Sequence, residues 1–138
     1  MPSYNAAKFI AAAIQSVIGQ TYSNWELLIT DDCSKDDTIN IIKKFQEIDN
    51  RIQLFSTGKN SGAAAARNIS LQNATGKYIA FLDSDDTWIS NKLETQIRFM
   101  EKNNISYSLS TYSVMKEDGT PTGNIMHAPK VIDYHGYL

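Results

Sequence analysis

The chain has 138 residues, which is enough for one domain with a real hydrophobic core. Hydrophobic residues make up 42% of it and charged residues 20%, a balance typical of a folded globular protein and unlike that of a disordered one. The formal net charge of −2 offers no basic surface to nucleic acid, and no apolar run reaches the roughly 18 residues that a transmembrane segment requires.

Helical and strand patterns alternate through the first part of the chain. Apolar residues recur at helical spacing over residues 6–19, and the short apolar run WELLIT at residues 25–30 is typical of a buried strand. A second helical pattern covers residues 38–48, and residues 51–56 alternate in polarity as a strand does.

The same alternation continues beyond residue 60. An alanine-rich helix is predicted over residues 63–72, a strand over 77–82, a helix over 89–102 and a further strand over 105–115. From Lys116 the chain is polar and rich in Gly and Pro, and no element is predicted there. Strands that alternate with helices over short connections predict an α/β fold with a mostly parallel sheet.

Two acidic clusters follow predicted strands. Asp31 and Asp32 end the first strand run, and the stretch DSDD, residues 83–86, ends the third. Ligands of open α/β sheets bind at the carboxyl ends of the strands, and neighbouring strands lie only about 4.8 Å apart, so we expect the two clusters to share one crevice. Carboxylates at a strand end suit Mg²⁺ or Mn²⁺, which keep coordination positions open for substrate phosphates.

Other interpretations of DSDD are open at this point. Asp85 or Asp86 could be the N-cap of the following helix, since Asp is a preferred cap. An apolar strand followed by Asp83, Asp85 and Thr87 also resembles the opening motif of haloacid-dehalogenase-like phosphatases, in which Asp83 would attack a phosphate. In that family the motif follows the first strand, and here it follows the third predicted one. A phospho-receiver module would need an acidic pair after its first strand and a lysine after its last, and no convincing equivalent is present.

The stretch GKNSGAAAARN places Arg67 on the alanine-rich helix. Arginine suits a bidentate contact with phosphate, and a surface ion pair is the alternative. Tyr4, in the stretch PSYN, could either pack on the core or stack on a ligand. The glycines match neither a dinucleotide fingerprint nor a P-loop.

Together, PSYNAAKFIAAAIQSVIGQTYSNWELLITDDCSKDDT, GKNSGAAAARN and GKYIAFLDSDDTW resemble the N-terminal half of family 2 glycosyltransferases of the GT-A fold, over residues 2–115. The resemblance implies a Rossmann-like, mostly parallel α/β sheet flanked by helices. It implies a nucleotide-sugar-binding part at residues 1–115 and the start of an acceptor-side region, or a tail, at residues 116–138. Family members have an apolar strand before PSYN and a longer acceptor half, so the fold is expected to be truncated at both ends.

The resemblance also implies a role for particular side chains. A nucleotide sugar, commonly a UDP-sugar, would lie across the strand ends, with its base near Tyr4 and its uracil bonded to Asp32. The residues expected at the nucleotide are Pro2, Tyr4, Asp32, Arg67 and Asp83. The residues expected at a Mn²⁺ or Mg²⁺ ion are Asp85 and Asp86. The catalytic base belongs to the acceptor side, and no residue is assigned to it.

The implied activity is an inverting, metal-assisted transfer of a sugar to an acceptor hydroxyl on a carbohydrate, a lipid-linked molecule or a protein, as in polysaccharide biosynthesis. The alternative is a non-catalytic nucleotide-binding fragment. The single cysteine, Cys33, excludes an internal disulfide and fits the cytoplasm, where the full-length enzyme could act at the inner face of the membrane. A sheet without its central strand leaves backbone groups unpaired, so self-association is expected.

Overall fold

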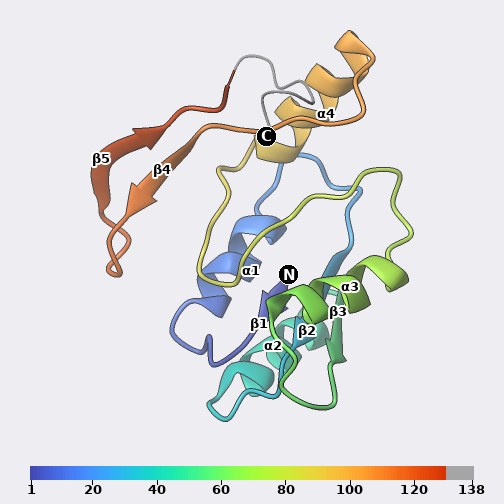
Figure 1. Ribbon diagram of the computed structural model, residues 1–138, viewed down its shortest axis with the longest axis vertical. Helices are drawn as coiled ribbons and strands as arrows, with labels where there is room; N and C mark the ends of the chain where they lie inside the picture. The colour runs from blue at the N-terminus through green and yellow to red at the C-terminus, as the bar shows by residue number, and fades with distance from the viewer. Residues whose placement is uncertain (130–138) are drawn as a thin grey trace. The chain divides into compact units, whose positions relative to one another are not determined.

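The computed structural model describes residues 1–129 (Figure 1). The chain divides into a first compact unit, Met1–Glu94, and a second, Thr95–Leu138, of which residues 95–129 are described. The two units are defined by packing. The predicted division after residue 115 concerns donor and acceptor sides and stays a prediction.

The first unit is built on a parallel sheet. Its strands are β1 (Pro2–Ser3), β2 (Leu27–Asp31) and β3 (Ile52–Ser56), in the spatial order β1-β2-β3 (Figure 1). All five residues of β2 pair with β3, whereas β1 contributes only two residues to the pairing on the other side. The sheet and its flanking helices confirm the predicted α/β class with parallel strands.

Helices α1 (Ile10–Ile18) and α2 (Thr38–Ile48) form the main core together with alternate residues of β2. The buried apolar side chains of this core include Ile10, Ile14, Val17, Leu27, Ile29, Ile42 and Ile52. Each fully buried side chain of this size contributes about 1.5–3 kcal/mol relative to its exposed state. The helical and strand periodicities of the sequence therefore predict this side of the fold well.

Helix α3 (Ala63–Asn73) packs on β2 through small side chains. Ala66 and Ser70, one helical turn apart, are both buried. The Ser70 hydroxyl lies 2.8 Å from the Thr30 hydroxyl and donates to the Leu28 carbonyl at 3.3 Å, which satisfies the polar atoms buried at this contact. This close packing fixes the start of α3 at the carboxyl end of the sheet.

The predicted strand at residues 77–82 is wrong, because the structure has no strand there. Ile79 and Phe81 are largely exposed, while Leu82 is buried in the core. One edge of the sheet is the two-residue strand β1, which is too short to pair with most of the backbone groups of a six-residue strand. The apolar pattern is present, but the pairing that would make it a strand is missing from this sheet.

Helix α4 (Lys92–Asn103) starts in the first unit and continues into the second, which also contains a hairpin of β4 (Tyr112–Met115) and β5 (Pro121–Met126). The strand predicted over residues 105–115 is correct only in its last four residues. Strand β5 was not predicted, and it pairs antiparallel to β4 with a register shift near Ser113. None of the helices described between residues 1 and 129 is long and apolar enough to cross a bilayer.

Candidate functional site

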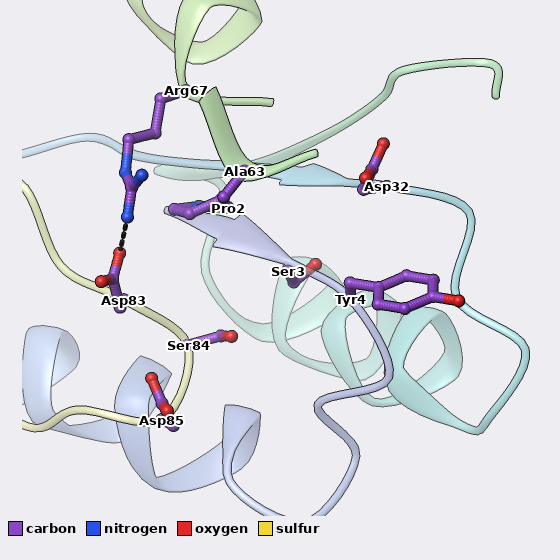
Figure 2. Close-up of a pocket in the computed structure, with 9 residues that line it drawn as sticks. All are labelled: Pro2, Ser3, Tyr4, Asp32, Ala63, Arg67, Asp83, Ser84 and Asp85. Atoms are coloured by element: carbon purple, nitrogen blue, oxygen red, sulfur yellow. Dashed lines mark hydrogen bonds and ion pairs between the residues drawn. The ribbon is translucent and has the colours of Figure 1, made fainter. Parts of the chain in front are cut away.

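A pocket of about 240 Å³ opens at the carboxyl ends of β1 and β2, beside the start of α3 (Figure 2). Its lining residues come from four separate stretches of sequence: Pro2, Ser3, Tyr4, Asp32, Ala63, Arg67, Asp83, Ser84 and Asp85. All five residues expected at a nucleotide are among them, and so is one of the two expected at a metal. Their individual roles stay predictions.

The pocket has two chemically different ends. In Figure 2, Tyr4 and Asp32 lie at one end and Arg67, Asp83 and Asp85 at the other. The remaining predicted residue, Asp86, lines a neighbouring cavity of about 360 Å³ that shares Arg67 and Asp83 with the first. An aromatic ring at one end and mixed charges at the other would suit a ligand that is flat at one end and highly charged at the other.

Arg67 and Asp83 form an ion pair across the charged end. Arg67 Nη2 donates to Asp83 Oδ1 at 2.5 Å, and the two side chains are 35% and 46% exposed. The surface ion pair considered for Arg67 is therefore real in this structure, yet it lies in the pocket wall. The other guanidinium nitrogens leave Arg67 capable of contacting an anion there.

The Tyr4 ring is 52% exposed, so packing on the core is not its role. Its neighbour Asn5 adopts a positive φ of 48° and is hydrogen-bonded to the loop between β2 and α2. The Asn5 amide donates to Ser34 Oγ at 2.9 Å, and the Lys35 amide donates to Asn5 Oδ1 at 2.8 Å. These two bonds fix the backbone that carries Tyr4 at the mouth of the pocket.

Asp32 is almost entirely buried, and its carboxylate accepts three internal hydrogen bonds. Oδ1 accepts from the Thr57 hydroxyl at 2.7 Å and the Ser61 amide at 2.8 Å, while Oδ2 accepts from the Gly62 amide at 2.7 Å. These bonds, foremost the one from Thr57, lower the pKa of Asp32 below its usual range. Asp32 thus anchors the loop that leads into α3 as well as lining the pocket.

Asp31 is not among the residues that line the pocket, contrary to expectation. It is buried, and its carboxylate accepts from the Ser34 hydroxyl at 2.5 Å, the Ser34 amide at 2.8 Å and the Ser3 hydroxyl at 3.2 Å. The expectation that both acidic clusters share one crevice is therefore correct for Asp32 and wrong for Asp31. Hydroxyl and amide donors, rather than a cation, satisfy its charge.

The second acidic cluster is more exposed than the first. Asp85 and Asp86 are exposed, and the Asp86 amide donates to the Asp83 carbonyl at 3.2 Å in a turn. Partial burial raises the pKa of Asp86, and the charges of Asp85 and Asp83 raise it further. Because α4 begins only at Lys92, the proposal that Asp85 or Asp86 caps that helix is wrong.

The acidic side chains of the described residues do not form a closed metal site by themselves. Among residues 1–129, no group of three or more His, Cys, Asp or Glu side chains converges closely enough to hold an ion. A magnesium-type ion in a phosphate site, however, is commonly bound by one or two carboxylates and completed by substrate phosphates and water. Exposed, mutually repelling carboxylates at Asp85 and Asp86 fit that requirement.

Three residues of the pocket were not predicted: Ser3, Ala63 and Ser84. Ser84 lies between two predicted acids, and Ala63 begins the helix that carries Arg67, so position in the chain could have indicated both. The sequence did not indicate the hydrogen bond from Thr57 to Asp32, because this bond depends on where the end of β3 lies relative to β2.

Comparison with known proteins gives consistent results. WfgD of Escherichia coli, named as a UDP-Glc:alpha-D-GlcNAc-diphosphoundecaprenol beta-1,3-glucosyltransferase, is 49% identical over 138 residues, which cover 100% of this chain and 53% of WfgD. The chain thus spans about half the length of that relative.

Solved structures support the fold. The fragment 1-349 of S. aureus TarS in complex with UDP-GlcNAc matches with a TM-score of 0.70 and 30% identity, over 75% of this chain and 30% of that fragment. The mannosyltransferase PcManGT from Pyrobaculum calidifontis, in complex with GDP-Man and Mn²⁺, matches with a TM-score of 0.69 over 83% of this chain and 34% of its own. At 22% identity, the likeness to PcManGT concerns the fold alone. These matches confirm the predicted GT-A fold.

The model of the family described as "Glycosyl transferase family 2" matches residues 1–135. That match covers nearly the whole chain, and it agrees with the motifs PSYN, DDCS, ARN and DSDD that meet around the pocket. The chain therefore belongs to glycosyl transferase family 2.

Proposed function

We propose that the pocket binds a nucleoside diphosphate sugar, with the base at the Tyr4 and Asp32 end and the diphosphate at the end that contains Arg67. The observation that carries this proposal is the meeting of five predicted nucleotide contacts, from separate segments, around one pocket. The exposed Tyr4 ring offers a stacking surface for the base, and Arg67 offers a cation for phosphate oxygens.

We further propose that uridine is the preferred nucleoside. An ionised carboxylate has about four acceptor sites, and Asp32 already uses three of them internally, so about one is left for a ligand. Uracil presents a single ring N–H, which needs one acceptor. Guanine presents a ring N–H beside an amino group, which together need two. The UDP donors in the names of WfgD and the TarS complex agree with this preference.

The proposed reaction is an inverting, metal-assisted transfer to an acceptor hydroxyl. Asp85 and Asp86 would hold Mn²⁺ or Mg²⁺ together with diphosphate oxygens, and the ion would neutralise charge on the departing nucleoside diphosphate. Arg67 supplies positive charge beside the same oxygens, and the anchored loop holds α3, which carries it, in place. The base that deprotonates the acceptor is expected on the acceptor side, with no residue assigned.

The acceptor is proposed to be a lipid-linked sugar, and the process polysaccharide assembly at the inner face of the membrane. WfgD is named for an acceptor carried on diphosphoundecaprenol and for a β-1,3 product, which a single displacement would form from an α-linked nucleotide sugar. Phosphate transfer by Asp83 is not favoured, because membership of a glycosyltransferase family accounts for the same acids.

Calorimetry with UDP, GDP, CDP and dTDP, each with Mn²⁺ and with chelator, tests the proposed donor site. UDP in Mn²⁺ should bind most tightly, and chelator should weaken binding. Equal affinity in both conditions would remove the metal from the proposal, and failure of every nucleotide to bind would overturn the donor site itself. Incubation with UDP-sugars and a lipid-linked acceptor then separates transfer from the alternative, nucleotide binding without turnover.

Self-association is the remaining proposed partner interaction. Ile79 and Phe81 are 49% and 61% exposed on a segment that resembles a strand in sequence but pairs with no strand in the described part of the chain. Light scattering coupled to size-exclusion chromatography should give a mass above that of one chain, and Ile79→Asp should lower it. A monomeric mass for the unmodified chain at high concentration would contradict the proposal.

A further inference from the structure

Thr57 lies directly after β3, outside the pocket, and its hydroxyl contacts the pocket residue Asp32. The Thr57 amide donates to the Asp31 carbonyl at 3.2 Å, which continues the β2–β3 pairing by one residue. Its hydroxyl donates to Asp32 Oδ1 at 2.7 Å. The hydroxyl is therefore held by the sheet, whereas the other two donors to Asp32 are amides of the loop at residues 58–62.

The two carboxylate oxygens of Asp32 differ in how many lone pairs they leave for a ligand. Oδ1 accepts from two groups, Thr57 and Ser61, so its two lone pairs are in use. Oδ2 accepts only from Gly62 among the bonds of the described residues, so one lone pair remains there. Loss of the Thr57 hydroxyl would free a second lone pair, on Oδ1, and would also release the rotation of the carboxylate.

We propose that Thr57 is a positioning residue that sets nucleobase specificity by restricting Asp32 to one free acceptor. This inference rests on the proposed function, since it concerns the base that would lie at Asp32. With Thr57 in place, a base with a single ring N–H is matched and a base with two adjacent donors leaves one of them unpaired. A buried donor without a partner is costly, so the restriction discriminates against guanine.

Calorimetry of Thr57→Val with UDP and with GDP is the direct test, because valine keeps the shape of threonine and removes the hydroxyl. We expect UDP to bind about tenfold more weakly and GDP to bind no more weakly than before, so that the UDP-to-GDP preference falls about tenfold. Thr57→Ser should restore the preference. Thr75→Val is the matched control: the Thr75 hydroxyl also donates to a carboxylate, that of Glu26 at 2.9 Å, but neither residue lines the pocket.

The outcomes separate the two proposals. If the unmodified chain binds none of the nucleotides, the proposed function is wrong and the role of Thr57 falls with it. If the unmodified chain prefers UDP and Thr57→Val weakens both nucleotides equally, the hydroxyl only supports the fold, and the specificity role is overturned. Urea unfolding verifies that Thr57→Val is folded, and Thr57→Ala, with the same expected loss of preference, replaces it if it is not.

Discussion

The two acidic clusters of the first unit look alike in sequence and differ in what satisfies their charge. Asp31 and Asp32 are 1% and 3% exposed, and each accepts three hydrogen bonds from amides and hydroxyls. Asp85 and Asp86 are exposed, and partial desolvation, followed by the charges of Asp85 and Asp83, raises the pKa of Asp86. The carboxylates of the first cluster are therefore already hydrogen-bonded within the fold, whereas those of Asp85 and Asp86 are exposed to solvent.

The difference follows from the backbone around each cluster. The loop after β2 supplies turn amides and hydroxyls, as at Ser34, that point back at the carboxylates. Within residues 1–129, the acidic segment at residues 83–86 forms no strand, and Asp83 is paired with the Arg67 guanidinium. Similar residue types are thus satisfied within the fold where donors are preorganised, and under the proposed function they bind a ligand where such donors are missing.

The largest expected effect is on stability, from Asp31→Ala. The change removes the acceptor of the Ser34 amide, the Ser34 hydroxyl and the buried Ser3 hydroxyl, so the free energy of unfolding should fall by about 3 kcal/mol or more. Urea unfolding measures it. Asp85→Ala is the matched control and should change stability by no more than about 0.5 kcal/mol. Similar losses in both variants would abolish the distinction between the clusters.

The next effect is on ligand binding, from the double change Asp85→Asn, Asp86→Asn. The increase in UDP affinity caused by Mn²⁺ should disappear, a loss of at least about tenfold, because amide oxygens carry no charge to hold the ion. Stability should not decrease, since repelling charges are removed. Calorimetry in Mn²⁺ and in chelator gives the comparison, and an undiminished Mn²⁺ effect would assign the ion to other groups.

The sequence predicts the core around β2 better than it predicts the segment at residues 77–82. The core around β2 follows from periodicity, because Ile10 and Ile14 in α1 and Ile42 in α2 belong to apolar patterns with helical spacing, and all three are buried. The segment at residues 77–82 has an equally strong strand pattern and forms no strand, because a strand depends on a neighbour that local sequence does not specify. Strand β5 was missed for the converse reason, since pairing with β4 stabilises a polar, glycine-containing stretch.

The site was predictable as a set of residues and not as a set of contacts. The motifs indicated that Tyr4, Asp32, Arg67 and Asp83 belong together, and they line one pocket. Nothing in the sequence indicated that Arg67 would pair with Asp83 or that Asp32 would be held by the loop before α3. Those contacts depend on loop conformations, including a positive φ of 87° at Gly62, which are set by the assembled sheet.

Arg67→Lys should have a moderate effect on binding and a small one on stability. The Arg67–Asp83 pair is partly exposed, and pairs of this kind contribute about 0–1 kcal/mol, so urea unfolding should hardly change. The planar guanidinium of arginine can contact Asp83 and a phosphate at the same time, whereas the ammonium of lysine cannot bridge them in this way. The affinity for UDP should therefore fall about tenfold. If Arg67→Lys binds UDP normally, the arginine serves only the ion pair and not the ligand.

The smallest expected effect is a pH dependence of stability caused by Asp36, in the loop between β2 and α2. Asp36 accepts from the Thr38 hydroxyl at 2.5 Å and from the Ala7 amide at 3.0 Å, and these bonds, the Thr38 hydroxyl first, lower its pKa in the folded state. An acid with a lowered folded pKa stabilises the fold fully above its unfolded pKa and loses that contribution as pH falls through the folded pKa. The free energy of unfolding should therefore decline below about pH 4, and less so in Asp36→Asn. Urea unfolding between pH 6 and pH 3 measures how steeply the free energy of unfolding depends on pH in the unmodified chain and in Asp36→Asn.

The difference between the two proteins should persist in 1 M salt, because hydrogen bonds cause it and ions screen hydrogen bonds little. Identical slopes in both proteins would mean that the Asp36 contacts do not favour its charged form.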